Sequence, residues 1–207
     1  MTLTTTIYLV RHGATAWNDA GRYQGRADVP LSARGVAEVR ALADQLRAVH
    51  FDAAYSSTLS RARMTAEILL EGSGLRALPL PDLDELSYGV LQGLTPEHRK
   101  ARHEPLDSCW RDTPWAVRFP EGESLADVEA RVVPAWKRIV EAHRGETVLV
   151  AAHGHVNRVL LLPIMGLPTD AFWTIDQPNA ACVIVRVGAT QTRTETLCRA
   201  AEMSGAA

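Results

Sequence analysis

Two histidines, each followed directly by a glycine, are the residues of this sequence best suited to chemistry. His12 lies between Arg11 and Gly13, and His153 precedes Gly154. A neutral imidazole nitrogen can attack phosphorus, and a neighbouring guanidinium can hold phosphoryl oxygens through its planar fork. Gly13 would let the backbone approach a bound anion closely. His12 is therefore a candidate nucleophile of phosphoryl transfer; the alternative is that Arg11 and His12 only cap a strand.

Three further ionisable side chains are candidates for the same site. Arg61 stands near the start of an expected helix, a natural anion site, or it is a solvated helix residue. His153 would gain a proton beside a phosphate dianion, or it is a hydrogen-bonded core histidine. Glu85 has apolar flanks, and burial would raise its pKa into the range of a general acid. Periodicity does not choose Glu85 over Asp82 or Asp84.

Short apolar runs that stop at polar residues predict the buried strands that would position these groups. The runs cover residues 7–10, 51–55, 148–152 and 182–187, with shorter strands at 78–80 and 192–197. Apolar residues at helical spacing predict helices in three places. One helix would begin after Ser32 as its N-cap, one would follow Ser57, and one would begin at a capping box formed by Ser124 and Asp127.

Strands that alternate with helices in this way predict the fold class. We expect an α/β domain, a three-layer α/β/α sandwich with a mostly parallel central sheet. Both His-Gly pairs would then lie at carboxyl ends of strands, where sheets of this kind bind ligands.

The composition is that of an ordinary compact domain. The chain has 207 residues, 46% of them hydrophobic, and a formal net charge of −2. This near balance argues against nucleic-acid and anionic-membrane partners. Three cysteines without metal-ligand spacing suit a reducing compartment, and we find no signal peptide, so we expect a cytoplasmic protein. No stretch approaches the roughly 18 apolar residues of a membrane span. The oligomeric state stays open.

We expect a single domain over residues 1–207 with a lid-like insert at about 94–122. The polar stretch 82–123 carries several prolines and at most one short helix, near 96–103. A long irregular insert is usually a functional lid or a disordered loop. Its aromatic residues Trp110, Trp115 and Phe119 either line a pocket or, as we prefer, anchor the insert to the domain.

The motifs of the chain, taken in order, resemble those of the histidine phosphatase superfamily, also called phosphoglycerate mutase-like. The resemblance covers about residues 7–187 and begins with the pattern RHGxTxxN at 11–18. The later matches are GRYQG at 21–25, PLS at 30–32, SSTLSRA at 56–62, LxExxxGxxxG at 83–93, PEGES at 120–124 and HG at 153–154. A chance match of this ordered series is very improbable.

The resemblance implies a role for each matching residue. His12 would form a phosphohistidine, and Glu85 would serve as the proton donor. Three side chains would surround the phosphoryl group: Arg11, Arg61 and His153. The implied substrate-binding residues are Asn18, Gln24, Tyr88 and Gly154. The resemblance implies a small phosphorylated substrate and neither a metal nor an organic cofactor.

Three functions are open at this point. A phosphomonoester hydrolase is our leading prediction, because mutases of the family resemble RHGES where this chain has Ala14-Thr15, and are usually longer. The alternative is a cofactor-dependent phosphoglycerate mutase, in which a substrate hydroxyl replaces water as phosphoryl acceptor. The third is a catalytically silent module that binds a phosphorylated ligand, which the presence of both His12 and Glu85 disfavours.

Overall fold

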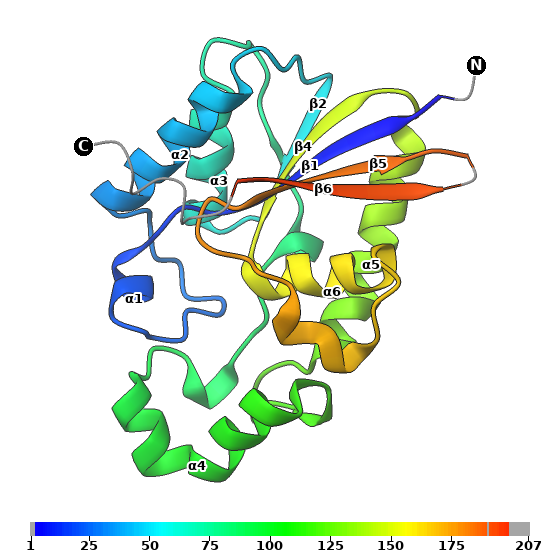
Figure 1. Ribbon diagram of the computed structural model, residues 1–207. Coiled ribbons are helices and arrows are strands. Elements are labelled where there is room, and N and C mark those ends of the chain that lie inside the picture. Colours follow the sequence, from blue (N-terminus) through cyan, green and yellow to red (C-terminus); the bar gives the residue numbers. More distant parts are fainter. Residues whose placement is uncertain (1–2, 190, 199–207) are drawn as a thin grey trace.

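A six-stranded sheet forms the centre of the molecule in the computed structural model, which describes residues 3–189 and 191–198 (Figure 1). The strand order is β3-β2-β4-β1-β5-β6. The strands are β1 (Thr5–Arg11), β2 (Ala53–Ser56), β3 (Leu78–Pro79), β4 (Thr147–Ala152), β5 (Cys182–Val187) and β6 (Thr192–Cys198). The four strands from β3 to β1 pair in parallel, whereas β5 pairs antiparallel with both β1 and β6. The expected mostly parallel sheet is confirmed.

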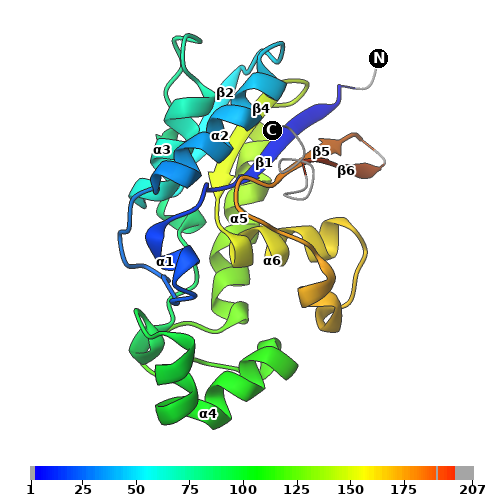
Figure 2. The same ribbon diagram turned by 60° about the vertical axis from the view of Figure 1, so that its left-hand side comes forward.

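Helices cover both faces of this sheet, so the three layers are also confirmed. Figure 2 shows α2 (Ala33–Leu46) and α3 (Ser60–Leu69) on one side, and α5 (Leu125–Ala142) and α6 (Gly154–Ile164) on the other. Successive strand residues point to opposite faces. Leu9 and Val150 accordingly join the core under α5 and α6, whereas Val10 and Leu149 join the core under α2 and α3.

The expected helix starts at Ser32 and Ser124 are both present. The Ser32 hydroxyl accepts a hydrogen bond from the Gly35 amide at 3.1 Å. Ser124 and Asp127 form the reciprocal capping box, in which the Asp127 carboxylate accepts from the Ser124 amide at 2.8 Å. Each cap satisfies an amide that the first helical turn leaves without a partner.

The segment between β1 and α2 packs so tightly that two glycines are required there. A Cβ atom on Gly13 would lie 2.5 Å from the Gly35 carbonyl oxygen, and one on Gly35 would lie 2.0 Å from the Ala14 carbonyl oxygen. Gly13 therefore serves close packing against α2. The expectation that it also lets the backbone approach an anion stays a prediction.

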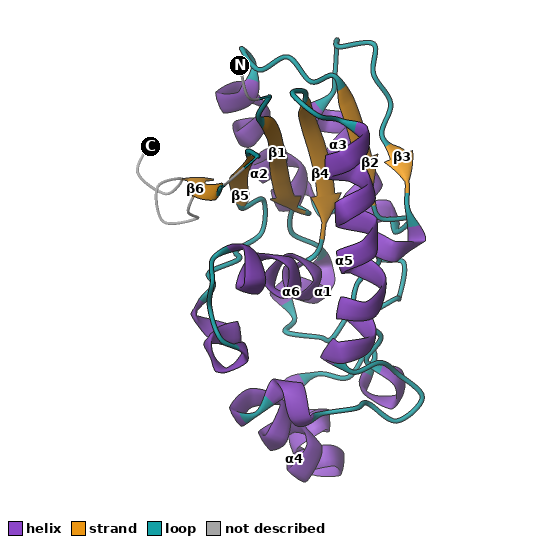
Figure 3. Ribbon diagram, turned by 90° about the vertical axis from the view of Figure 1, so that its right-hand side faces the viewer, coloured by secondary structure: helices purple, strands orange, loops and turns teal. Residues whose placement is uncertain are grey.

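The insert is more regular than the sequence indicates. It holds α4 (Pro96–Asp112), which is longer than the expected helix at 96–103 and contains a kink at His103, whose φ of −139° is not helical. Figure 3 shows α4 well away from the sheet, beyond the carboxyl ends of its parallel strands. The side chains of Trp110 and Phe119 are buried in the core with α5 and α6, which supports the preferred anchoring interpretation. Trp110 also lines the pocket described below, so both interpretations hold for this residue.

Short helices complete the connections between these elements. They are α1 (Ala16–Asp19) and the 3₁₀ turns η1 (Pro81–Leu83), η2 (Gly89–Leu91), η3 (Pro114–Ala116) and η4 (Thr169–Thr174). In the described part of the chain, every helix is too short or too polar to cross a lipid bilayer.

Candidate active site

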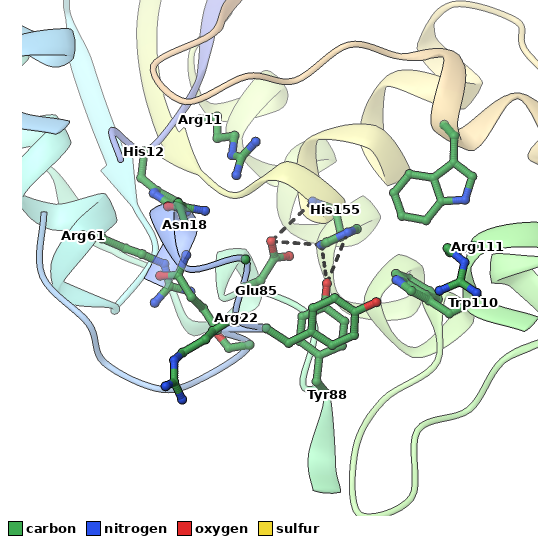
Figure 4. A pocket seen from close by; sticks show the side chains of 15 residues that line it. Arg11, His12, Asn18, Arg22, Arg61, Glu85, Tyr88, Trp110, Arg111 and His155 are labelled. Carbon is green, nitrogen blue, oxygen red and sulfur yellow. Dashed lines mark hydrogen bonds and ion pairs between the residues drawn. The ribbon is translucent and has the colours of Figure 1, made fainter. Parts of the chain in front are cut away.

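The two His-Gly pairs meet because β1 and β4 are adjacent parallel strands. Arg11 at the end of β1 lies beside Ala152 at the end of β4, so His12 and His153 follow at the same edge of the sheet. Their ring centroids lie 5.1 Å apart. A pocket of about 610 Å³ opens at this edge (Figure 4).

The backbone selects the tautomer of His12. The ring nitrogen Nδ1 lies 2.7 Å from the carbonyl oxygen of Gly13, which can only accept, so Nδ1 carries the proton and Nε2 the lone pair. Burial and the nearby cations Arg61 and Arg11 hold the pKa of His12 well below its ordinary value. His12 is therefore a neutral imidazole with a nucleophilic Nε2.

Two guanidinium groups, the buried one of Arg61 and the half-buried one of Arg11, make the site strongly cationic. Arg61 is fully buried and donates to the carbonyl oxygens of Ala27 and Gly25 at 2.8 and 2.7 Å. Arg11 donates to the carbonyl oxygen of Gln177. Within residues 3–189 and 191–198 neither guanidinium has an ion-pair partner, and the Nε atom of each is buried without a hydrogen bond.

Burial lowers the pKa of Arg61 to about 10, so this group stays charged at neutral pH. Burying a charge without a counter-ion is costly, which makes an anion the expected ligand of this arrangement. Asp28 and Glu85 are carboxylates whose charge acts on Arg61 from a distance, without an ion pair.

His153 lies directly against His12 and is completely buried. Both of its ring nitrogens lack a hydrogen-bond partner in the described structure. Burial and the charge of Arg61 hold the pKa of His153 well below its ordinary value, so the ring is neutral in the protein itself. The approach of an anion would raise that pKa, which is the condition under which the sequence predicts a protonated His153.

Glu85 is directed into the pocket by its neighbour Asp84. The Asp84 carboxylate accepts from the Ser57 hydroxyl at 2.7 Å and from the Thr58 amide at 2.8 Å, which fastens this loop to the segment before α3. The buried Glu85 carboxylate then lines the same pocket as His12. The sequence left the choice among three acids open, and only Glu85 of the three lines the pocket.

The expected ionisation of Glu85 is wrong. Burial acts to raise its pKa, as predicted, but the contact with His155 and the hydrogen bond from the Leu86 amide outweigh burial and hold the pKa well below the ordinary value. His155 Nδ1 lies 3.2 Å from Glu85 Oε2. The Leu86 amide donates to Oε1 at 2.9 Å. Glu85 is thus a carboxylate in the protein.

The remaining residues named from the sequence are divided between the pocket and its surroundings. Asn18, Gln24 and Tyr88 line the pocket. Gly154 lies outside the pocket wall, where a Cβ atom would sit 3.4 Å from Arg11 Nε. Asn18 is also held by the capping box of α1, because its side-chain oxygen accepts from the Thr15 amide at 3.1 Å.

The pocket also contains His155 and Trp173, neither of which was a candidate from the sequence. The run His153-Gly154-His155 is visible in the sequence, but nothing local indicates that its second histidine contacts Glu85, 70 positions earlier. The outer wall also contains Arg22, Tyr23, Trp110 and Arg111 (Figure 4). In the described residues, no group of three or more His, Cys, Asp or Glu side chains is arranged to hold a metal ion.

This geometry defines an α/β protein with a cationic pocket beside a neutral histidine. The chain belongs to the histidine phosphatase superfamily, branch 1, whose family model matches residues 7–199. It is therefore an enzyme of that superfamily.

Known relatives of the chain fall into both functional classes considered above. A 2,3-bisphosphoglycerate-dependent phosphoglycerate mutase of Brucella anthropi is 37% identical over 92% of this chain and 96% of the relative. Phosphoserine phosphatase 1 of Hydrogenobacter thermophilus is 32% identical over 87% of this chain and 86% of the relative. The solved structure of YhfR from Bacillus stearothermophilus superposes with a TM-score of 0.88 at 32% identity, over 93% of this chain and 96% of that one.

Proposed function

We propose that this protein is a phosphomonoester hydrolase that acts on a small phosphorylated metabolite through a phosphohistidine on His12. The observation that carries the proposal is the pair of guanidiniums of Arg11 and Arg61, which lie beside a neutral His12. The Nε atom of each is buried, and neither has an ion-pair partner in the described structure. This arrangement suits a dianionic phosphoryl group and a nucleophile at the same time.

In the first step, Nε2 of His12 attacks phosphorus while the bond from phosphorus to the ester oxygen breaks. The departing oxygen takes a proton from Glu85. Because Glu85 is a carboxylate in the protein, it gains that proton from a monoanionic substrate, whose second phosphate pKa is about 6. The charges of Arg11 and Arg61 stabilise the phosphoryl oxygens throughout.

In the second step, water attacks the phosphohistidine. Glu85, again a carboxylate, accepts a proton from that water as the phosphorus–nitrogen bond breaks, and inorganic phosphate leaves. His12 returns to its neutral tautomer, because the Gly13 carbonyl still accepts from Nδ1. Neither step uses a metal ion or an organic cofactor.

We further propose roles for the surrounding residues. His153 becomes a donor to the phosphoryl group once that anion raises its pKa. Asn18, Gln24 and Tyr88 bind substrate from the pocket wall, and Gly154 keeps the space beside Arg11 open. The insert around α4 forms the substrate-specific wall. A cytoplasmic location stays a prediction from the cysteine content.

A phosphoglycerate mutase is the second candidate, and the Brucella anthropi relative favours it. Chain length does not separate the two functions, because the alignment spans nearly all of both chains. Ala14 and Thr15 do not distinguish the two functions through contact with a substrate either. The Ala14 side chain is buried, Thr15 caps α1, and both lie outside the pocket wall.

The outer cations of the pocket bear on the choice between the two reactions. A phosphoglycerate has a carboxylate in addition to its phosphate, and a mutase site needs a cation for it. Arg111 is already paired with Asp107 and Glu104. Arg22 donates to the neutral carbonyl oxygen of Gly93 and keeps its charge, so these cations are compatible with both reactions.

A panel of phosphomonoesters assayed with chelator present tests the proposal. The panel includes 3-phosphoglycerate with and without 2,3-bisphosphoglycerate. We expect release of inorganic phosphate, whereas isomer interconversion without release would establish the mutase. A rapid quench in alkali should capture phosphate on His12 as an acid-labile adduct. His12→Ala should lower turnover at least about a thousandfold. Binding of phosphate esters without any turnover would identify a silent module instead.

A further inference from the structure

His155 is the pocket residue whose contacts are not explained by the steps above. It is the second residue of α6, directly after the His153-Gly154 pair. Its backbone amide lies 3.4 Å from Glu85 Oε2, and its ring nitrogen Nδ1 lies 3.2 Å from the same oxygen. Two donors of one residue therefore converge on one oxygen of the Glu85 carboxylate (Figure 4).

The ring of His155 is held in place by an aromatic cage. It stacks nearly parallel on Phe172, with centroids 5.9 Å apart and planes at 13°, and it meets the rings of Trp110 and Trp173 at 5.4 and 5.8 Å. These neighbours offer the ring no carboxylate. The packing fixes the ring plane, so its nitrogens can serve only partners that lie in that plane.

The polar partners of the ring form a short chain. The Tyr88 hydroxyl lies 3.3 Å from each ring nitrogen. Burial and the charge of Glu85 raise the pKa of Tyr88 well above its ordinary value, so this hydroxyl keeps its proton and can donate. A Tyr88 proton directed at Nε2 leaves Nδ1 as the donor to Glu85, because a carboxylate can only accept.

We propose that His155 is a positioning residue of the active site: Nδ1–H donates to Oε2 of Glu85 and holds that carboxylate ionised and directed into the pocket. The inference rests on the proposed function and deepens it. An ionised Glu85 is the form that takes the proton of the water attacking the phosphohistidine. No proton passes to or from His155 in that step, since His155 keeps its own proton.

Other charged and titratable groups also act on Glu85. They are His153 and Arg158 of α6, Arg11 and His12 after β1, Arg61 of α3, and Tyr88 of its own loop. In the described structure none of these groups donates a side-chain hydrogen bond to the Glu85 carboxylate, whereas His155 does.

The test compares two replacements of His155. His155→Phe keeps an aromatic ring against Phe172 and removes the donor, whereas Asn in place of His155 retains an amide donor near the position of Nδ1. His98→Phe, at an exposed position of α4, is the matched control. The readout is the rate of phosphohistidine loss against pH, after rapid loading with p-nitrophenyl phosphate, which needs no proton on its leaving group.

We expect the acid limb of this profile to move to higher pH by about one unit in His155→Phe, because a carboxylate that loses a donor has a raised pKa. His155→Asn should restore most of the shift, and His98→Phe should match the native profile. A His155→Phe profile that superimposes on the native one, with phosphohistidine still formed, overturns this inference and leaves the proposed function intact. If native protein forms no phosphohistidine, the proposed function itself falls.

A second measurement leaves His155 in place. Carboxyl ¹³C NMR of the native protein, with the Glu85 signal assigned through Glu85→Gln, reports the titration directly. We expect a midpoint below the ordinary value for glutamate, and a change in the His155 ring signals over the same pH range. A Glu85 midpoint at or above the ordinary value overturns the inference.

Discussion

At the scale of single residues, this site works by placing neutral and charged groups side by side. His12 and His153 are neutral because burial and two arginines oppose a further positive charge. Glu85 is charged although it is buried, because His155 and the Leu86 amide donate to it. A nucleophile with a lone pair and a carboxylate ready to accept a proton therefore coexist at one pH.

Glu85→Gln tests the proton transfer assigned to Glu85. We expect turnover of alkyl phosphomonoesters to fall by about 10²–10⁴-fold, the usual contribution of a general acid–base group. The formation of phosphohistidine from p-nitrophenyl phosphate should fall much less, because its leaving anion needs no proton. Burst kinetics on both esters provide the measurement. Equal slowing of the first step for both esters would assign Glu85 another task.

At the scale of elements, the site depends on how closely α2 approaches the end of β1. Gly13 and Gly35 allow that approach, and the Ala14 amide adds a hydrogen bond to Glu38 of α2 at 2.8 Å. The Gly13 amide also donates to the Thr65 hydroxyl of α3 at 3.2 Å. The backbone that carries His12 is thus fastened to both helices on that face of the sheet.

Gly35→Ala tests how much the close approach of α2 to the end of β1 contributes to stability and activity. Alanine favours a helix interior by about 1 kcal/mol over glycine, so propensity alone would stabilise the variant. A Cβ atom 2.0 Å from the Ala14 carbonyl oxygen must instead push the strands and helix apart. We expect a net loss of about 1–3 kcal/mol in the free energy of unfolding and a lower kcat, because His12 moves with Ala14.

Denaturant unfolding and steady-state assays of the Gly35 variant provide the measurements. Gly188→Ala is the control, since its Cβ would meet its nearest neighbour, the Gln191 carbonyl oxygen, at 3.3 Å and lie in the β5–β6 hairpin. An unchanged or raised stability for Gly35→Ala would show that the loop relaxes at little cost.

At the scale of the whole molecule, buried neutral histidines make folding sensitive to acid. The pKa of His12 and of His153 is lowered in the folded state, so the unfolded chain binds more protons below about pH 6.5. Stability therefore falls as pH drops through that value. The depressed pKa of Glu85 adds a second loss at lower pH, below the ordinary glutamate value.

His153→Gln tests this linkage. It removes one of the two titrating imidazoles, so the slope of unfolding free energy against pH, between about pH 6.5 and 5, should decrease by up to about 1.4 kcal/mol per unit. Urea unfolding at several pH values measures the slope, with exposed His98→Gln as control. Identical slopes in His153→Gln and native protein would contradict a neutral, buried His153.

The sequence by itself determined the strands, the helix starts at Ser32 and Ser124, and the placement of His12 and His153 at one sheet edge, because periodicity and caps are local properties. Only the tertiary structure decided which acid lines the pocket and in what ionisation state. That outcome depends on the contact of Glu85 with His155, which is 70 positions distant in the chain. Charges and burial act through space, so no local pattern could predict that the pKa of Glu85 is lowered rather than raised.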